Sequence, residues 1–154
     1  MPTPPFRADI VGSFLRPAEL AEARRGFASG QIDADGLRRV EEAAIAELVQ
    51  NQADAGLQLA TDGEFRRAWW HFDFFGLLEG VDIVALDHGI QFQGVETKPH
   101  GIEVSGKIGF PDNHLFLDHF RSLKSLLENT PGAVPKFTIP APTVLDFRLE
   151  PDHI

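Results

Sequence analysis

The sequence predicts a mixed α/β fold that contains a parallel sheet and an inserted β-ribbon. Segments with the pattern of strands alternate with segments of helical period, and this alternation is typical of a parallel sheet. Residues 80–110 interrupt the alternation with short β-prone pieces, which indicate a β-ribbon insertion. The chain has 154 residues, of which 43% are hydrophobic, so we expect one domain over residues 1–154, with residues 1–9 as a tail.

The first elements are a short strand and a helix. Ile10 and Val11 predict a short buried strand, and Pro17 stands at a position that proline favours at the start of a helix. From Pro17 to Ser29, apolar residues recur at helical spacing, and Gly30 is a typical C-terminal stop.

A second, longer helix is expected between Asp33, which can act as its N-cap, and Gly56, which ends it. Residues 57–60 then predict a strand, and this strand runs into the polar residues 61–64. The apolar stripe of the helix consists of four residues at helical spacing, Leu37, Val40, Ala44 and Leu48.

The second half of the chain opens with an aromatic helical stretch over residues 67–78 and continues into the ribbon. Two β-prone pieces of the ribbon, residues 90–95 and 102–108, are separated by an expected tip at residues 98–101.

The last part of the chain predicts a helix, a strand at residues 136–139 and a further helical segment from Thr143. Three strands cannot form a parallel sheet with both faces covered, and a closed eight-stranded barrel needs at least about 200 residues, so we expect an incomplete architecture. Asn113 can cap the helix, whose apolar residues are Phe116, Phe120, Leu123 and Leu127.

Composition excludes several classes of function. The formal net charge of −9 argues against nucleic acid and anionic membranes as partners, because both require a basic surface. The sequence has no cysteine and therefore offers neither a disulfide nor a thiolate metal ligand. Residues 1–6 lack the features of a signal peptide, and no apolar run has the length of a membrane span. We expect a soluble, cytoplasmic protein.

Two of the predicted strands end in small and polar residues. Gly12 and Ser13 follow the first strand, and residues 61–64 (Thr-Asp-Gly-Glu) follow the second. In parallel α/β folds, ligands bind at these strand ends, where small residues let the backbone approach and hydroxyl or carboxylate groups bind. The alternative is structural: a glycine turn with a capping serine, and an acidic pair solvated in a loop.

Several charged side chains next to the second strand are candidate ligand contacts. Glu64 could bind the ammonium group of an amino acid, and an arginine such as Arg66 could bind its carboxylate, although a structural ion pair is the usual role of such neighbours. Asp62 and His71 are secondary candidates, and a histidine in an aromatic run is more often a core residue. The spacing of the six histidines predicts no metal site. The sequence has neither a Gly-rich phosphate loop nor a nucleophile-elbow motif, and we predict no catalytic residue in this chain.

Four segments, taken in order, resemble the cobalamin-independent methionine synthase family: "VGSFLRP", "GLQLATDGEFRR", "GKI" and "KFTIPAPTVL". The closest likeness is to the short, single-barrel branch related to the catalytic C-terminal domain, and it covers the N-terminal portion of that domain. The resemblance implies part of a (β/α)8 (TIM) barrel, about its first three βα units. It also implies a zinc-dependent methyltransferase that transfers a methyl group to a thiol. In the methionine synthases the acceptor is homocysteine, the product is methionine and the donor is a polyglutamylated methyltetrahydrofolate, whereas related barrels alkylate other thiols, so the resemblance leaves the acceptor thiol and the methyl donor of this chain open.

The resemblance also assigns roles to individual residues. Val11 and Ser13 would contact the substrate carboxylate through backbone and hydroxyl groups, and Glu64 would accept hydrogen bonds from its ammonium group. The family's zinc ligands, a histidine, cysteines and a glutamate, belong to later strands, so we expect them to be absent from this chain. Alone, the chain is then expected to bind substrate weakly and to catalyse nothing, with its C-terminal half missing.

Two other functions fit the same residues. A non-catalytic half-barrel could act as a binding or assembly module that pairs with itself, as a homo-oligomer, or with another chain to cover its open sheet edge. An enzyme of the same superfamily with other chemistry, such as tetrapyrrole decarboxylation, is a third reading, which "TDGEFRR" fits poorly.

Overall fold

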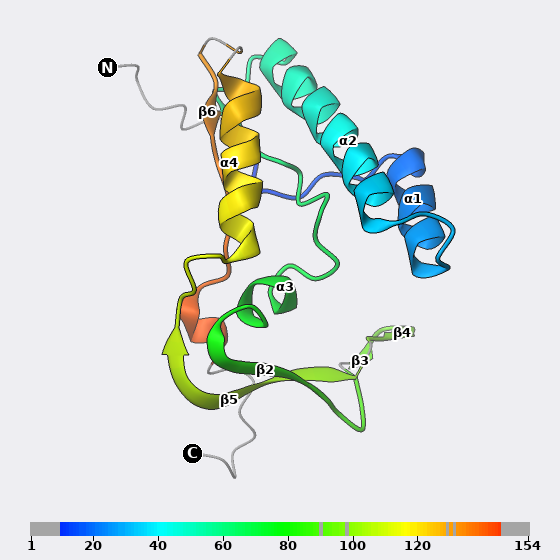
Figure 1. Ribbon diagram of the computed structural model, residues 1–154, viewed down its shortest axis with the longest axis vertical. Coiled ribbons are helices and arrows are strands. Elements are labelled where there is room, and N and C mark those ends of the chain that lie inside the picture. Colours follow the sequence, from blue (N-terminus) through cyan, green and yellow to red (C-terminus); the bar gives the residue numbers. More distant parts are fainter. Residues whose placement is uncertain (1–9, 90, 98, 129, 131, 146–154) are drawn as a thin grey trace. The chain divides into compact units, whose positions relative to one another are not determined.

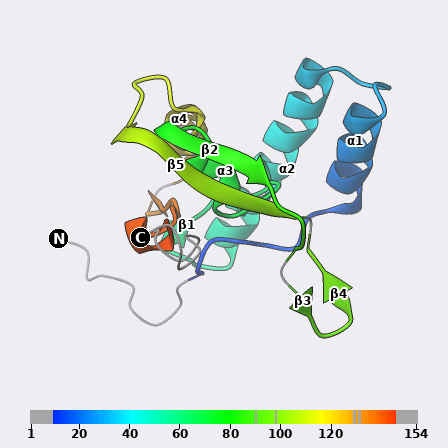
Figure 2. The same ribbon diagram turned by 90° about the horizontal axis from the view of Figure 1, so that it is seen from below.

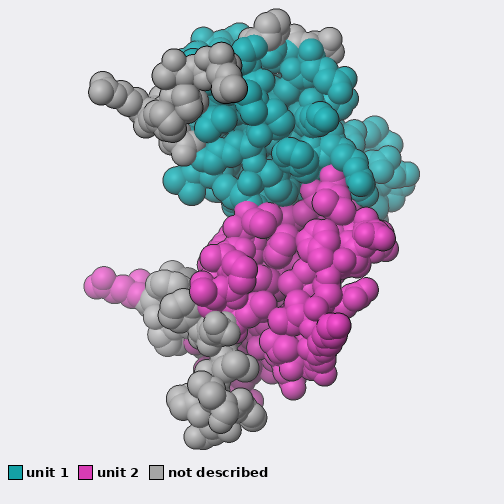
Figure 3. Space-filling model, turned by 90° about the vertical axis from the view of Figure 1, so that its left-hand side faces the viewer, with its two compact units in different colours: residues 1–67, 118–138 teal, residues 68–117, 139–154 magenta. Residues whose placement is uncertain are grey.

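The computed structural model describes residues 10–145 except residues 90, 98, 129 and 131. The chain divides into two compact units (Figure 3). The first unit comprises residues 1–67 and 118–138, and the second comprises residues 68–117 and 139–154. The expected tail at residues 1–9 lies outside the described residues.

Two helices of the first unit form where the sequence predicts them. Helix α1 spans Ala18–Ala28 and helix α2 spans Ala34–Asp54, and the two lie side by side (Figure 1). Asp33 is the N-cap of α2, because its carboxylate accepts a 2.7 Å hydrogen bond from the Gly36 backbone N–H. This bond satisfies one of the donors that a helix N-terminus leaves without a partner.

The first unit also contains a short parallel sheet. Strand β1, Leu59–Ala60, pairs in parallel with strand β6, Val134–Pro135. The Val134 N–H donates to the Gln58 carbonyl at 2.8 Å, and the Lys136 N–H donates to the Ala60 carbonyl at 2.9 Å. The strand predicted at residues 136–139 therefore lies two residues earlier, where the backbone meets β1.

The prediction of a short buried strand at Ile10 and Val11 is wrong. Neither residue lies in a strand, and Val11 is 84% exposed. The Ile10 carbonyl accepts a hydrogen bond from the Lys136 side chain. A β-branched pair forms a strand only where a neighbouring backbone completes a ladder, and this segment does not make one.

A hydrophobic core holds the helices and the sheet of the first unit together. Helix α4, Leu115–Leu127, contributes two of its buried side chains at helical spacing, in agreement with the predicted apolar register. Because such side chains are removed from water, their burial supplies most of the stability of a domain this small. The buried members of the core are Leu20, Ile45, Val49, Ala60, Phe65, Leu123 and Leu127.

The second unit is built around an antiparallel ribbon. Strand β2, Glu79–Ala85, pairs with strand β5, His100–Gly109, and Figure 2 shows the two side by side. Strands β3, Gln91–Phe92, and β4, Val95–Glu96, form a separate small hairpin. Residues 102–108 thus pair with β2 rather than with residues 90–95.

The aromatic helix of the second unit is shorter than predicted. Helix α3 spans only Phe72–Phe75, because the Asp73 carboxylate accepts hydrogen bonds from the backbone N–H groups of Ala68 at 2.6 Å and Trp69 at 3.2 Å. These bonds replace helical ones in the preceding residues. The helical segment predicted from Thr143 is a 3₁₀ helix, η1, Pro142–Val144.

The described residues thus form a mixed α/β structure. Within this part of the chain, no helix combines the length and apolar character required to cross a membrane.

Candidate functional site

The polar segment that follows β1 in the first unit is held by a network of hydrogen bonds. The Gln52 side chain bonds both backbone groups of Thr61, donating to its carbonyl at 2.8 Å and accepting from its N–H at 3.0 Å. The Thr61 hydroxyl donates to the Gly12 carbonyl at 2.8 Å and accepts from the Gly63 N–H at 3.1 Å. Gly12 and the polar residues that follow β1, which the sequence predicted at the ends of two strands, therefore lie against one another.

Glycine is required at position 12 by this close approach. A Cβ atom on Gly12 would lie 2.7 Å from the Thr138 hydroxyl oxygen and 2.9 Å from Glu64 Oε1. Both distances are shorter than normal van der Waals contacts. The glycine of "VGSF" thus leaves room for the side chains of Glu64 and Thr138.

Glu64 has an unusual backbone conformation. Its φ of 57° makes it the one non-glycine residue with a positive φ in the described part of the chain. Its N–H donates to Asp62 Oδ1 at 3.0 Å, and its carbonyl accepts from Arg16 Nη2 at 3.0 Å. Because the left-handed conformation is costly for residues other than glycine, its occurrence here indicates a tightly determined position.

The Glu64 carboxylate is anchored through one oxygen. Oε1 accepts from the Thr138 hydroxyl at 2.7 Å and from Arg67 Nη1 at 3.3 Å. Arg67 also donates to the Thr138 carbonyl, and its guanidinium lies 5.1 Å from the centre of the Phe137 ring. The side chains of Glu64 and Arg67 are 14% and 4% exposed, so this is a nearly buried ion pair.

Asp62 is a second buried carboxylate beside Glu64. Its residue is 2% exposed, and among the described residues its Oδ2 has no hydrogen-bond partner. Burial raises the pKa of the Asp62 carboxyl above its ordinary value, while the Glu64 N–H and the charges of Arg67 and Arg66 partly oppose this. The charged form of Asp62 is therefore disfavoured in the folded protein.

We expect the free energy of unfolding of Asp62→Asn, relative to that of the wild type, to be higher at neutral pH than in acid. The raised folded-state pKa means that the folded protein binds more protons than the unfolded chain once the pH exceeds the unfolded value, so stability is lost as the pH rises. Asparagine keeps an acceptor for the Glu64 N–H and removes this penalty. Urea denaturation between about pH 3 and pH 7 should show the variant gaining on the wild type as pH rises; a constant difference would contradict the prediction.

The other predicted ligand contacts have different surroundings. Val11 and Ser13 flank Gly12, and both residues are exposed. Arg66 donates through Nη2 to the Ser122 hydroxyl at 3.3 Å, so the arginine that meets Glu64 is its neighbour Arg67. Their roles toward a ligand remain predictions.

His71 belongs to the second unit. It is 3% exposed and stacks near the rings of Trp70 and Phe72, with centroid distances of 4.3 Å and 4.1 Å. These are the surroundings of a histidine in an aromatic core.

Sequence reasoning missed the contribution of Thr138 and Gln52. Thr138 lies 74 residues from Glu64 along the chain, yet its hydroxyl is the nearest donor to the carboxylate. The available signal was its place just after a parallel strand, because side chains there share one edge of the sheet with those that follow β1.

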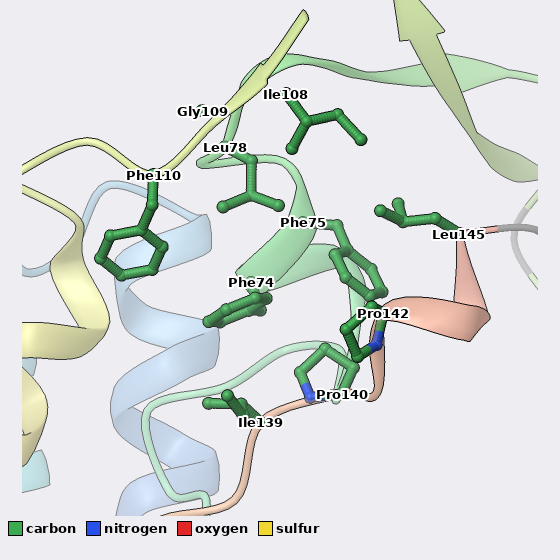
Figure 4. A pocket seen from close by; sticks show the side chains of 10 residues that line it. All are labelled: Phe74, Phe75, Leu78, Ile108, Gly109, Phe110, Ile139, Pro140, Pro142 and Leu145. Carbon is green, nitrogen blue, oxygen red and sulfur yellow. The ribbon is translucent and has the colours of Figure 1, made fainter.

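The second unit contains an apolar cavity of about 420 Å³. It lies between α3, the end of β5 and residues 139–145 (Figure 4). Phe74, Phe110 and Ile139 are among its walls, and none of the ten lining residues is charged.

The described residues do not fit a zinc ion. Within the parts of the chain that the structure describes, no three His, Cys, Asp or Glu side chains gather closely enough to hold a metal. The sequence also contains no cysteine that could act as a thiolate ligand.

Comparisons with known proteins found relatives that are much longer than this chain. The chain is 47% identical over 152 residues to the uncharacterized protein YxjG of Bacillus subtilis. This match covers 97% of the chain and 39% of YxjG. A methionine synthase of Sulfolobus acidocaldarius is 33% identical over 58 residues, or 38% of the chain and 17% of that protein. No family model matches the chain.

A solved structure is similar over nearly the whole chain. It is a crystal structure from Listeria monocytogenes with the provisional name vitamin-B12 independent methionine synthase. It is 38% identical, with a TM-score of 0.74, and the match covers 94% of this chain and 39% of that one. The chain therefore spans about two fifths of the length of YxjG and of this solved structure.

Proposed function

The chain is related to the cobalamin-independent (vitamin-B12 independent) methionine synthases, as its motifs predict, and from this premise we propose that it forms the N-terminal portion of a methyltransferase barrel. The proposed reaction is transfer of a methyl group to the thiol of homocysteine or a similar acceptor, which gives a thioether such as methionine. Methyltetrahydrofolate is the proposed methyl donor. Within this barrel, the described residues bind and orient the amino-acid end of the acceptor.

The observation that carries this proposal is the fixed carboxylate of Glu64. It lies four residues after the end of β1, and the adjacent backbone at Gly12 is free of side-chain bulk. Ligands of parallel α/β folds bind at such strand ends. A carboxylate held in this position can accept charge-assisted hydrogen bonds from an ammonium group.

The remaining contacts come from the segment around Gly12. The exposed Ser13 hydroxyl and the Val11 backbone are available for the carboxylate of the amino acid. The segment around Gly12 would then bind the substrate carboxylate, and Glu64 would bind the ammonium group. Contacts at both groups fix the orientation of the thiol side chain. The Asp62 carboxylate supports Glu64 by accepting a hydrogen bond from the Glu64 backbone N–H.

The parallel pair of β1 and β6 supports the architecture that we propose, a partial (β/α)8 barrel of about three βα units. Zinc, which the described residues do not fit, is proposed to bind residues outside this chain.

Glu64→Gln tests the proposed function. We expect the variant to bind L-homocysteine or L-methionine about tenfold more weakly, because a neutral amide replaces the carboxylate that receives the ammonium group. Isothermal titration calorimetry measures the affinity, and Glu47→Gln on the exposed face of α2 is the matched control. Equal binding by the wild type and Glu64→Gln would show that Glu64 does not bind the ammonium group.

The alternative function, a non-catalytic assembly module, has one supporting observation. The sheet of β1 and β6 contains only these two strands among the described residues, so each has an edge to which a further strand can add. A module of this kind would not bind either amino acid, and the same calorimetry separates the two proposals.

A further inference from the structure

The two carboxylate oxygens of Glu64 have different surroundings. Oε1 accepts from the Thr138 hydroxyl and from Arg67, at 2.7 Å and 3.3 Å. Oε2 makes no hydrogen bond with any described residue, and the side chain retains 14% exposure. An ionised carboxylate can accept about four hydrogen bonds, so Glu64 retains acceptor capacity on the Oε2 side.

Thr138 is itself held in place from two sides. Its backbone carbonyl accepts from Arg67 Nη2, and the Arg67 carbonyl in turn accepts from Arg16 Nη2 at 2.6 Å. The missing side chain at Gly12 leaves room for the Thr138 hydroxyl and methyl groups, which a Cβ atom would meet at 2.7 Å and 2.8 Å. The hydroxyl therefore points at Glu64 from a fixed backbone position.

We propose that Thr138 is a positioning residue for ligand binding: its hydroxyl, together with Arg67, occupies Oε1 of Glu64 and leaves Oε2 to receive the ammonium group of an amino-acid ligand. This inference rests on the proposed function. A carboxylate that is fixed before the ligand arrives loses less side-chain freedom on binding, and this raises affinity. Neither β6 nor Thr138 carries a charge, so Thr138 would raise the affinity for the ligand by fixing the position of the Glu64 carboxylate.

The test compares two variants of Thr138 with two ligands. Thr138→Val removes the hydroxyl at nearly constant volume, and Thr138→Ser keeps it. The ligands are L-methionine and 4-(methylthio)butanoate, which is the same molecule without the amino group. We expect Thr138→Val to weaken methionine binding about fivefold and to leave binding of the amino-free analogue unchanged, whereas Thr138→Ser binds both as the wild type does. Thr143→Val, at an exposed residue of η1, is the control.

Each other outcome has a separate meaning. Equal weakening of both ligands by Thr138→Val would show that Thr138 only supports the fold, and this would overturn the inference. A wild-type preference for methionine that Thr138→Val leaves intact would overturn the role of Thr138 while keeping that of Glu64. A wild type that binds both ligands equally, or neither, would overturn the proposed function and this inference with it.

Discussion

Replacement of Gly63 by alanine is expected to lower the free energy of unfolding by about 2–5 kcal/mol. Gly63 has a φ of 67°, a left-handed conformation that costs alanine about 1–2 kcal/mol. Its Cβ atom would also overlap Leu48 Cδ2 and lie 2.9 Å from the Phe65 ring, and such overpacking costs about 1–3 kcal/mol. Phe65 is a buried core residue, so it cannot easily move away.

Gly30→Ala is a matched control for this experiment. Gly30 has a similar φ of 74°, but a Cβ atom there would meet nothing within 4 Å. Alanine at position 30 thus measures the backbone cost alone, and urea denaturation of both variants gives the steric contribution as the difference. If both substitutions lowered the free energy of unfolding by the same amount, the close packing against Leu48 and Phe65 would not be the reason that position 63 requires glycine.

The helices of this protein could be predicted well because their signals are local. Asp33 satisfies a donor of its own helix within three residues, and the apolar register of α4 matches the period of a helix. Helix α3 was overestimated because Asp73, a residue inside the predicted stretch, bonds the backbone ahead of it. No periodicity argument detects such a competing side-chain bond.

The strands were harder to predict because a strand depends on its partner. Val11 has the β-branched character of a strand residue, yet no neighbouring backbone makes a ladder with it. β6 forms at Val134–Pro135 rather than two residues later, where its backbone bonds those of Gln58 and Ala60. These partners are more than 70 residues away in the sequence, and composition does not encode their register.

In the candidate site, too, features with a local sequence signal could be predicted, and contacts between distant segments could not. Family resemblance singled out Glu64, and the small residue at position 12 was a visible signal for close packing. The choice between Arg66 and Arg67 as its partner could not be made from the sequence, because the left-handed backbone at Glu64 changes the direction of the residues that follow. Thr138 reaches the site only through the pairing of β6 with β1.

Replacement of Arg67 by methionine is expected to cost about 3 kcal/mol of stability, which is typical of removing one partner of a buried ion pair. The Arg67 side chain is 4% exposed and bonds both the Glu64 carboxylate and the Thr138 carbonyl. Methionine has a similar length and can still pack against Phe137, so the loss reflects charge and hydrogen bonds. Urea denaturation near neutral pH measures the change.

A double-mutant cycle with Glu64→Gln separates the ion pair from packing. In the Arg67→Met background, the Glu64 carboxylate is left nearly buried without its cation, so converting it to glutamine should now recover stability rather than reduce it. The coupling between the two substitutions is expected to be about 1–3 kcal/mol. Strictly additive effects would show that Arg67 stabilises the protein through the Thr138 carbonyl and Phe137, and that Glu64 is held chiefly by the Thr138 hydroxyl.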